Sequence, residues 1–435
     1  MLYYSTRKQS SMASLKEALL KGLAPDGGLY MPQTIRLYPP AFYKNMAGMS
    51  LREISFVVAE AFWNDDIPAD LLQEIIYDSI NFDMPLVKIA DNRYLIELFH
   101  GPSYSFKDVG MRLMARLLGY FGGKTAQKTV NVFASTTGDT GAAMAEAFAG
   151  VPGVRAYILY PRGKVSAIQE KQMALQSGNI VPFEIDGTFE DCQRLIRQIF
   201  GDKELNRNIL ITSANSVNVA RLLPQSFYYF YAYANLLKIV EKPTDVVCSV
   251  PCGNFGSLTA GLIAKRMGLP IKRFVAATNR NDVFERYLST GSYEPRPSVP
   301  TIASSMDVGA PFNIERIREL YADGQDRLRN DVESVSYDDE QICETMRRVY
   351  AEANYMLDPH GAVAYRALDE KLRPGEIGIS LAPAHPAKYA ESVSRVLGAE
   401  VPVPTRLVAM QQYRKRSIPM SPLFADLKKF LMREM

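Results

Sequence analysis

The sequence has few cysteines, and their spacing excludes two common kinds of site. The four cysteines are too few and too scattered for a disulfide scaffold: Cys192, Cys248, Cys252 and Cys343. Cys248 and Cys252 do not form a Cys-x-x-Cys pair and have no histidine near them, so we interpret them as small buried side chains. We therefore expect no metal site, and a reducing, cytoplasmic location fits this cysteine usage.

The sequence also lacks an excess of charge of one sign and any long apolar run. Lysine and arginine number 50 against 47 aspartates and glutamates, which leaves a net charge of +3. This balance argues against a nucleic-acid surface and against a polybasic membrane patch. No apolar run is long enough to span a bilayer, and residues 1–7 lack the apolar core of a signal peptide. We expect neither a nucleic-acid nor a membrane partner.

The first hundred residues combine helix and strand patterns. Ser14 and Glu17 have the spacing of a capping box, and further helices are predicted over 51–62 and 69–80. Two apolar runs, 86–89 and 94–99, are joined by a short polar turn and predict a β-hairpin. The whole chain, with 435 residues of which 47% are hydrophobic, is long enough for two or three domains.

From about residue 128 onward, strand and helix patterns alternate. Strands are predicted over 129–133, 155–160, 180–185, 209–212, 246–250, 271–277 and 377–381. Helices are predicted from Ser166 and over 140–149, 189–200, 217–240, 258–267 and 387–397. The alternation predicts an α/β fold with parallel sheets covered on both faces, in which ligands bind beyond the carboxyl ends of the strands. Two interpretations remain for Pro224, a kink or a late helix start, and for 288–311, an ordered loop or a lid.

One lysine lies in a loop with turn-forming residues. Residues 99–108 read Phe-His-Gly-Pro-Ser-Tyr-Ser-Phe-Lys-Asp and precede a helix predicted over 109–120. Most lysines are solvated surface charges, so Lys107 by itself indicates little. A lysine that meets loops able to bind phosphate and carboxylate can hold an aldehyde cofactor as a Schiff base.

Two strand-to-helix turns have the composition of anion sites. Residues 135–141, Ser-Thr-Thr-Gly-Asp-Thr-Gly, offer amides and hydroxyls, although a helix cap at Asp139 or Thr140 explains the same residues. Residues 251–257 contain two glycines that let the backbone close around a ligand. They match neither a dinucleotide fingerprint nor a P-loop, so a monophosphate fits better, while a plain βα turn stays open.

A third turn, 213–221, carries Asn215, Ser216 and Arg221, which can converge on another anion. If the helix begins near Ser216, Arg221 lies one turn inside it; a simple cap is the alternative. Two histidines, His360 and His385, can each be structural or catalytic, and His100 precedes the lysine in its loop.

Five segments in order resemble the threonine synthase family, which uses pyridoxal phosphate and belongs to the tryptophan-synthase-β-like class. They are residues 99–108, 135–141, 214–221, 252–257 and 381–388, and residues 3–6 and 22–30 resemble the family's opening. The family converts O-phospho-L-homoserine and water into L-threonine and phosphate. The resemblance implies a fold type II α/β enzyme, with the cofactor in the cleft between two parallel-sheet domains and a mixed α+β N-terminal segment. We expect an N-terminal segment over 1–100, a smaller domain with the lysine and substrate loops over 101–240, and a larger domain with the cofactor-phosphate loop over 241–435.

The resemblance also implies a role for individual residues. Lys107 would be the Schiff-base lysine for pyridoxal 5'-phosphate, and Asp139 is expected to contact the cofactor. The residues that would hold the cofactor phosphate are Gly253, Asn254, Phe255 and Gly256. Those that would bind the substrate carboxylate are Thr136, Thr137 and Thr140. The substrate phosphate would lie on Asn215, Ser216 and Arg221. We expect a monomer or a homodimer.

One residue departs from the family's pattern. Similar enzymes usually carry a threonine before Ala-His-Pro, whose hydroxyl meets the pyridine nitrogen, and Pro383 stands there in this sequence. Proline offers no side-chain donor or acceptor, which affects the cofactor's strength as an electron sink. Three alternatives stay open: a phospholyase that yields 2-oxobutyrate, a serine or threonine dehydratase, and a non-catalytic cofactor-binding protein, which Pro383 favours. The dehydratase fits poorly, because it would leave Asn215 and Arg221 without a phosphate.

Overall fold

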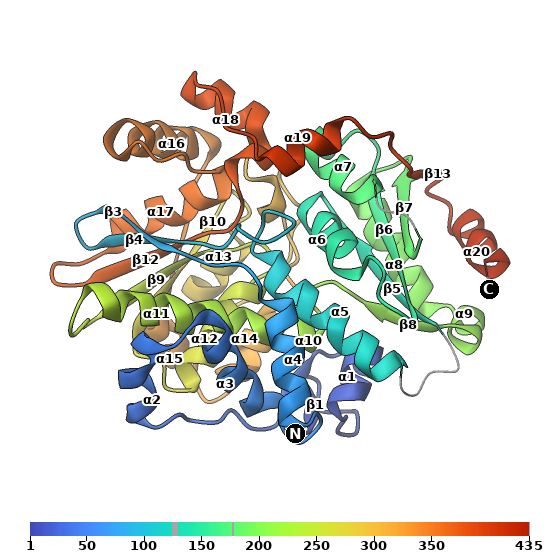
Figure 1. The fold of residues 1–435 in the computed structure, drawn as a ribbon, viewed down its shortest axis with the longest axis horizontal. Coiled ribbons are helices and arrows are strands. Elements are labelled where there is room, and N and C mark those ends of the chain that lie inside the picture. The colour runs from blue at the N-terminus through green and yellow to red at the C-terminus, as the bar shows by residue number, and fades with distance from the viewer. Residues whose placement is uncertain (124–128, 176–177, 435) are drawn as a thin grey trace. The chain divides into compact units, whose positions relative to one another are not determined.

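The computed structural model describes residues 1–123, 129–175 and 178–434 (Figure 1). The chain forms two compact units. Unit 1 contains Met1–Met31, Lys107–Arg221 and Val403–Met435, and unit 2 contains Pro32–Phe106 and Leu222–Pro402. This division differs from the three consecutive parts predicted over 1–100, 101–240 and 241–435. Local patterns could not reveal it, because both ends of the chain join unit 1 through long-range contacts.

Unit 1 is built on a parallel sheet with strand order β13-β7-β6-β5-β8. Its strands are β5 Val130–Ser135, β6 Val154–Pro161, β7 Ile180–Ile185, β8 Leu210–Ser213 and β13 Ile418–Met420. Its helices are α1 Leu15–Lys21, α5 Lys107–Gly123, α6 Asp139–Phe148, α7 Ala167–Ala174, α8 Phe189–Gly201, α9 Lys203–Asn208, α10 Val219–Leu222, α19 Thr405–Gln411 and α20 Phe424–Arg433. The predicted central strands are confirmed, whereas β13, α9, α19 and α20 were not predicted. The short strands β1 Tyr3–Ser5 and β2 Tyr30–Pro32 form a separate two-stranded sheet.

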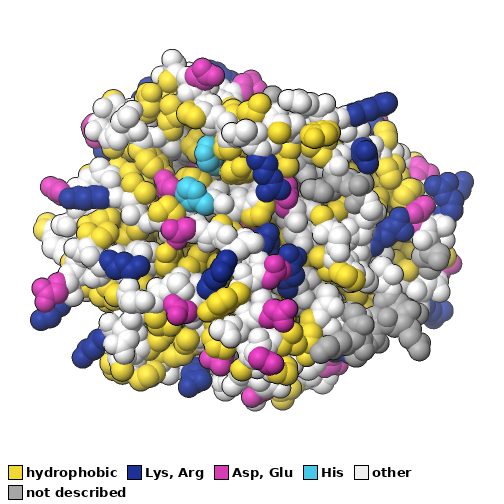
Figure 2. Space-filling model, in the orientation of Figure 1, with side chains coloured by type: hydrophobic (Ala, Val, Ile, Leu, Met, Phe, Trp, Pro, Cys, Tyr) yellow, Lys and Arg dark blue, Asp and Glu magenta, His cyan; other side chains and the backbone are white. Residues whose placement is uncertain are grey.

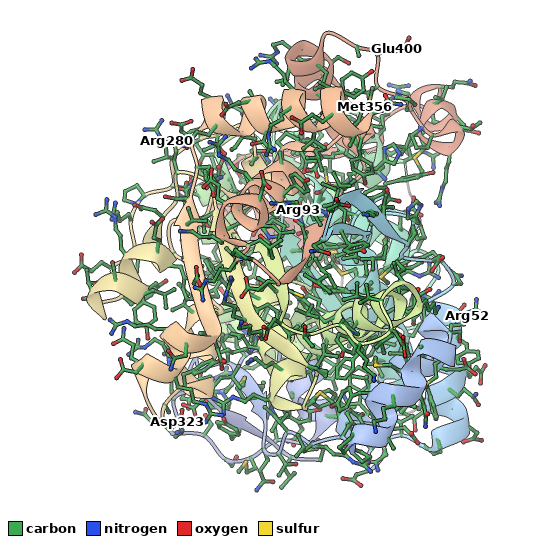
Figure 3. The ribbon with its side chains drawn as sticks, turned by 90° about the vertical axis from the view of Figure 1, so that its left-hand side faces the viewer. Arg52, Arg93, Arg280, Asp323, Met356 and Glu400 are labelled. Carbon is green, nitrogen blue, oxygen red and sulfur yellow. The ribbon has the colours of Figure 1, made fainter. Side chains whose placement is uncertain are left out.

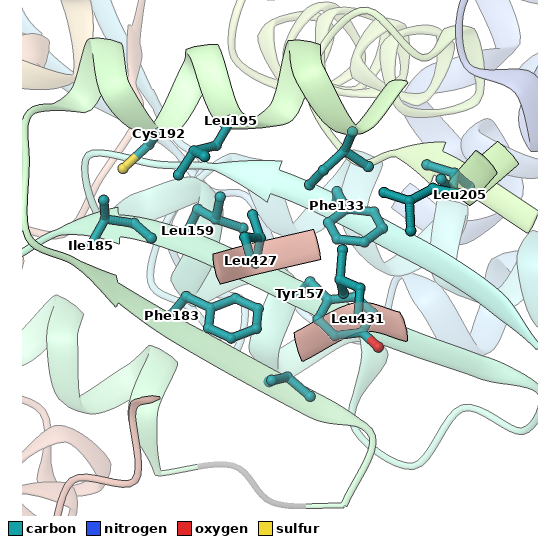
Figure 4. Close-up of a cluster of buried hydrophobic side chains, with 13 residues drawn as sticks. Phe133, Tyr157, Leu159, Phe183, Ile185, Cys192, Leu195, Leu205, Leu427 and Leu431 are labelled. Carbon is teal, nitrogen blue, oxygen red and sulfur yellow. The ribbon is translucent and has the colours of Figure 1, made fainter. Parts of the chain in front are cut away.

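An aromatic stack crosses three neighbouring strands in the core of unit 1 (Figure 4). The rings of Phe133 and Tyr157 lie 4.7 Å apart and nearly parallel, and Phe183 continues the stack at 6.0 Å from Tyr157. Leu195 of α8 and Leu427 of α20 pack into the same cluster. Because this core holds the strands in register, the loops at their carboxyl ends have fixed starting points.

Unit 2 contains a six-stranded sheet with strand order β11-β10-β9-β12-β4-β3. Its strands are β3 Leu86–Ala90, β4 Arg93–Glu97, β9 Val246–Pro251, β10 Ile271–Thr278, β11 Val332–Ser336 and β12 Ile377–Ala382. Its helices are α2 Pro40–Asn45, α3 Leu51–Trp63, α4 Ala69–Ser79, α11 Phe227–Ile239, α12 Gly256–Arg266, α13 Val283–Thr290, α14 Ile314–Leu320, α15 Gln325–Asp331, α16 Asp339–Ala353, α17 Pro359–Lys371 and α18 Ala390–Leu397. Strands β3 and β4 form the predicted antiparallel hairpin, and the other neighbours in the sheet are parallel. Strand β11, helix α2 and helices α13 to α17 were not predicted.

Arg93, the first residue of β4, connects the hairpin to the rest of unit 2. It is labelled near the centre of Figure 3. Its Nε donates to Asp369 Oδ1 of α17 at 2.6 Å, and Arg348 of α16 binds the other carboxylate oxygen at 2.8 Å. Helix α17 itself packs on β9, β10 and β12. These contacts hold the start of β4 beside β12, so the segments that follow both strands emerge from the same edge of the sheet.

The two segments with open interpretations have clear structures. Pro224 lies in a 3₁₀ turn, Leu223–Ser226, that separates α10 from α11, so the helix predicted over 217–240 is interrupted and its long part starts late, at Phe227. Residues 288–311 form an ordered loop closed by a hydrogen bond from Arg296 N to Gly309 O. Asn281 and Val299 exchange two hydrogen bonds, of 2.8 and 3.0 Å, across its base. The structure therefore supports the ordered-loop interpretation.

The surface agrees with the near-neutral charge balance. Acidic and basic side chains are interspersed over the face in Figure 2, without a large area of one sign. Within the part of the chain that the structure describes, no helix has both the length and the apolarity needed to cross a membrane.

Candidate functional site

Lys107 is the first residue of α5, rather than a loop residue two positions before a helix as predicted. The helix starts early because the preceding segment is held by the residue that follows β12 in unit 2: Phe106 N donates to Pro383 O at 2.8 Å. The Lys107 side chain is mostly buried, with 13% of its surface exposed. Its Nζ lies 3.9 Å from Asp139 Oδ2. Sequence reasoning singled out both residues, and the fold of unit 1 brings them together.

Asp139 is held in position by Gln169 of α7. Gln169 Nε2 donates to Asp139 Oδ1 at 2.9 Å, which leaves Oδ2 on the side of Lys107. The Gln169 amide is itself fixed, because its Oε1 accepts a hydrogen bond from Ser166 N in the predicted capping box. Sequence reasoning used Gln169 only as a helix-start signal and missed its contact with Asp139.

The turn 135–141 is organised by Thr136, not by a cap at Asp139 or Thr140 as one interpretation proposed. Thr136 Oγ1 accepts hydrogen bonds from Gly138 N at 2.9 Å and Gly141 N at 3.0 Å. Gly138 has φ +136°, and an added Cβ would lie 2.3 Å from the Gln169 side chain, so only glycine fits there. Because a hydroxyl can accept two hydrogen bonds and still donate one, Thr136 keeps a donor for a ligand.

The turn 213–221 differs from its prediction in where the helix starts. Helix α10 begins at Val219, not near Ser216, and Arg221 lies in its first turn. Asn218, which sequence reasoning missed, organises the turn: its amide donates to Leu19 O at 2.9 Å and Ser213 O at 3.2 Å. Its Oδ1 accepts a hydrogen bond from Ala220 N at 3.1 Å.

Two of the predicted phosphate ligands in this turn have features of a binding site. Asn215 Oδ1 is buried and has no hydrogen-bond partner among the described residues. Arg221 is 6% exposed and donates from Nη1 to Ala214 O at 2.5 Å. Burial lowers the pKa of the Arg221 guanidinium to about 10, so it stays protonated at neutral pH. Gly110 of α5 packs on the Arg221 backbone, where an added Cβ would lie 2.4 Å from the carbonyl oxygen.

The turn 251–257 of unit 2 presents a row of backbone N–H groups. Helix α12 begins at Gly256, two residues earlier than predicted, after Phe255 in the left-handed conformation (φ 59°, ψ 14°). Among the described residues, no hydrogen-bond acceptor is found for the amides of Gly253, Asn254, Phe255 and Gly256. Gly253 leaves no room for a side chain, because an added Cβ would lie 3.0 Å from Met306 Cα. Unpaired amides at the start of a helix are a common phosphate-binding arrangement.

Two tyrosines of α11 hold this turn, and sequence reasoning missed both. The hydroxyls of Tyr228 and Tyr229 lie 2.7 and 2.9 Å from Ser257 Oγ, and Tyr229 also donates to Ser257 O. Burial raises the pKa of both phenols, so they remain neutral. The sequence shows the aromatic run of α11, but nothing in this run indicates that two of its tyrosines bind Ser257.

The three histidines have structural partners. His385 Nδ1 accepts a hydrogen bond from Ala387 N at 3.1 Å, and burial lowers the pKa of its imidazole to about 4. His360 Nε2 accepts from Ser305 N, so its Nδ1 carries the proton that Asp358 Oδ2 accepts at 2.6 Å. His100 Nε2 lies 2.6 Å from Glu97 Oε2. The two cysteines discussed above are buried, as expected.

Each unit taken by itself has features that fit a part of pyridoxal phosphate, whose aldehyde needs an amine and whose phosphate needs hydrogen-bond donors. Unit 1 supplies a buried lysine beside an oriented aspartate. Unit 2 supplies the unpaired amides of residues 253–256, whose number and place at a helix start suit a phosphate monoester.

Comparison with known proteins identifies the family. Residues 89–381 match the family described as pyridoxal-phosphate dependent enzyme, residues 2–80 match the threonine synthase N terminus, and residues 361–431 match its C-terminal part. The sequence is 40% identical to threonine synthase of Escherichia coli over 99% of both chains, and 34% identical to that of Saccharomyces cerevisiae over 91% of this chain and 89% of the yeast one.

Solved structures agree with the sequence relatives. The crystal structure of the Escherichia coli threonine synthase superposes with a TM-score of 0.93 over the full length of both chains, at 40% identity. A pyridoxal-phosphate-bound threonine synthase from Brucella melitensis gives 0.92 at 32% identity, covering 100% of this chain and 99% of the other. The predicted fold class, family and cofactor are thereby confirmed. The chain belongs to the threonine synthase family of pyridoxal-phosphate-dependent enzymes.

Proposed function

We propose that this enzyme converts O-phospho-L-homoserine and water into L-threonine and phosphate. The observation that carries the proposal is the 40% identity to threonine synthase over 99% of both chains. The site residues support it, because the chain offers separate groups for a lysine-bound aldehyde, a carboxylate and two phosphates. The bound cofactor supplies an electron sink for the negative charge that develops on the substrate carbons.

Lys107 holds the cofactor and then moves protons at the α, β and γ carbons of the substrate. Its amine is suited to this role because it is largely shielded from bulk water and lies near one oriented carboxylate. The Asp139 carboxylate pairs with the ammonium form of Lys107. The hydrogen bond from Gln169 keeps this carboxylate from rotating away from Lys107. A proton taken by Lys107 Nζ is therefore retained in the site until it is returned to carbon.

The substrate's two anionic ends are assigned to two turns of unit 1. Thr136, Thr137 and Thr140 bind the carboxylate, with Thr136 donating its hydroxyl proton. Asn215, Ser216 and Arg221 bind the phosphate. Arg221 suits a phosphate because its guanidinium remains charged and its Nη1 is already fixed on Ala214 O. Asn215 can contact a phosphate only through its Nδ2 donor, because its buried and unpaired Oδ1 is an acceptor.

Gly253, Asn254, Phe255 and Gly256 bind the cofactor phosphate through their amides. We predict that the enzyme is a monomer or a homodimer. We also predict that it is located in the cytoplasm. Pro383 leaves the pyridine nitrogen without the side-chain hydroxyl that similar enzymes usually provide. We infer that the missing hydroxyl lowers the rate of the reaction and does not change which reaction is catalysed.

The decisive experiment is product analysis with purified protein and O-phospho-L-homoserine. Threonine and phosphate released in equal amounts support the proposal. Release of phosphate with 2-oxobutyrate would instead identify a phospholyase, and absence of phosphate release would leave the dehydratase and the non-catalytic cofactor-binding protein. The Lys107→Ala variant should lose phosphate release together with the visible absorbance of the lysine-bound cofactor, and retained absorbance would refute the Lys107 assignment.

A second variant separates the substrate phosphate site from the cofactor. Arg221→Ala should raise KM for O-phospho-L-homoserine at least tenfold, because it removes a charge-assisted contact worth about 1.5–3 kcal/mol. Its affinity for pyridoxal phosphate should remain that of the wild type. An equal loss of both affinities would move Arg221 to the cofactor.

A further inference from the structure

A buried arginine lies behind the turn that we assign to the cofactor phosphate. Arg316 belongs to α14 of unit 2, and its side chain is completely buried. Burial lowers the pKa of its guanidinium to about 9, which still leaves it charged at neutral pH. A buried cation must be hydrogen bonded to be tolerated. Arg316 Nη1 donates to Asn313 Oδ1 at 2.6 Å.

Asn313 links Arg316 to the 252–257 turn. It is also completely buried, and its Nδ2 donates to the backbone carbonyl of Asn254 at 2.9 Å. Next to it, Phe312 N donates to Asn254 Oδ1 at 3.3 Å. The start of α14 thus binds both the backbone and the side chain of Asn254. Figure 1 shows α14 beside α12, the helix that this turn opens, and the two helices are in contact.

The direction of this hydrogen bond fixes the direction of an amide. In a trans peptide the carbonyl and the following N–H point to opposite sides. Because the Asn254 carbonyl points toward Asn313, the N–H of Phe255 points away from α14. Phe255 adopts a left-handed conformation that costs a non-glycine residue energy, so this peptide is held by its surroundings. One of the four phosphate-binding amides is therefore oriented by Asn313.

Arg316 decides which end of the Asn313 amide faces the turn. A guanidinium has donors only, so it can bind the oxygen of Asn313 but not the nitrogen. With the oxygen on Arg316, the nitrogen is left to donate to the Asn254 carbonyl. A turned amide would place two oxygen atoms against each other, and the Asn254 peptide would lose its support.

We infer that Arg316 and Asn313 are positioning residues that set the affinity of the 252–257 turn for the phosphate of pyridoxal phosphate. The inference rests on the proposed assignment of residues 253–256 to that phosphate. It goes beyond that assignment by placing the control of phosphate affinity on two residues that line no ligand. Arg316 acts through Asn313, and Asn313 acts through the peptide between Asn254 and Phe255.

The test compares a ligand that has the phosphate with one that lacks it. The apoenzyme is titrated with pyridoxal 5'-phosphate and with pyridoxal, and each Kd is measured from the absorbance of the lysine-bound form. Arg316→Met removes the guanidinium but keeps a chain of similar length. We expect this variant to bind pyridoxal phosphate about tenfold more weakly, the loss of one buried hydrogen bond to a charged group. Its Kd for pyridoxal should stay that of the wild type.

Asn313→Leu tests the second step and remains informative if Arg316→Met fails to fold. It removes the hydrogen bond to Asn254 at nearly constant volume and keeps the charge of Arg316. The same selective loss of phosphate affinity is expected. The inference would be overturned if both variants fold and each has the same ratio of the two Kd values, for pyridoxal and for pyridoxal phosphate, as the wild type.

Arg273→Met is a matched control. Arg273 is 3% exposed and binds Glu376 at 2.6 Å, and no hydrogen bond links it to the 252–257 turn in the described residues. Its loss should lower the melting temperature without changing the ratio of the two Kd values. If the control changes the ratio as much as Arg316→Met does, the effect reflects general destabilisation and the inference is refuted. If the wild type binds pyridoxal and pyridoxal phosphate equally well, the assignment of residues 253–256 to the phosphate is wrong. This result differs from one in which only the inference on Arg316 and Asn313 is wrong.

Discussion

The neutral imidazole of His385 should make unit 2 lose stability as the pH falls from 7 to 5. His385 lies among Phe99, Tyr104, Glu97 and His100, and burial lowers its pKa from 6.5 to about 4. Between these two values the unfolded chain binds a proton that the folded protein does not, so stability rises with pH in this window. The full shift corresponds to about 3 kcal/mol, of which about 2 kcal/mol is lost between pH 7 and pH 5.

The assay is urea unfolding of the wild type and of His385→Asn at both pH values. Asparagine keeps an acceptor for Ala387 N but cannot titrate, so the variant isolates the proton. Glu97 has a lowered pKa: burial opposes the shift, and hydrogen bonds from His100 and Tyr355 overcome it. It therefore remains ionised over this window in both proteins. The wild type should lose about 2 kcal/mol more than the variant on going from pH 7 to pH 5. Equal losses in the two proteins would refute the assigned protonation state.

Three further substitutions test other parts of the structure. Gln169→Leu removes the donor to Asp139 and should lower kcat about tenfold in a phosphate-release assay, with little change in cofactor affinity. Phe183→Ala opens the aromatic stack of unit 1 and should cost about 3–5 kcal/mol, measured by urea unfolding. Gly110→Ala places a methyl group 2.4 Å from the Arg221 carbonyl and should raise KM for O-phospho-L-homoserine more than it lowers kcat. An unchanged KM in that variant would contradict the role of Arg221.

Local signals in the sequence predicted most of the elements and misplaced the starts of α5, α10 and α12. The capping boxes at Ser14 and Ser166 both form, because every partner lies within three residues. The start of α5 at Lys107 depends instead on Phe106 binding Pro383, a contact between residues far apart in the chain. The start of α12 at Gly256 was missed because glycine is a poor helix former and Phe255 needs an unusual conformation.

The residues that orient the site were harder to predict than the residues that form it. Lys107, Asp139 and Arg221 carry chemical groups that suggest a role. Gln169 and Asn313 are ordinary amides whose importance comes from their partners, which lie 30 and 59 positions away. A single sequence contains no periodic or local signal for such pairs. They become visible only when the fold places the two segments side by side.

Two glycine-containing turns that look alike in the sequence use their amides differently, and we therefore propose different ligands for them. In 135–141, Thr136 accepts the N–H groups of Gly138 and Gly141, so this turn meets a ligand mainly through hydroxyl groups. In 252–257 no side chain of the turn takes that place, and the amides of residues 253–256 stay available. A phosphate dianion profits from several converging amides at a helix start, whereas a carboxylate needs only two or three donors. The hydrogen bonds that Thr136 makes in the first turn therefore support the proposed assignment of the cofactor phosphate to the second.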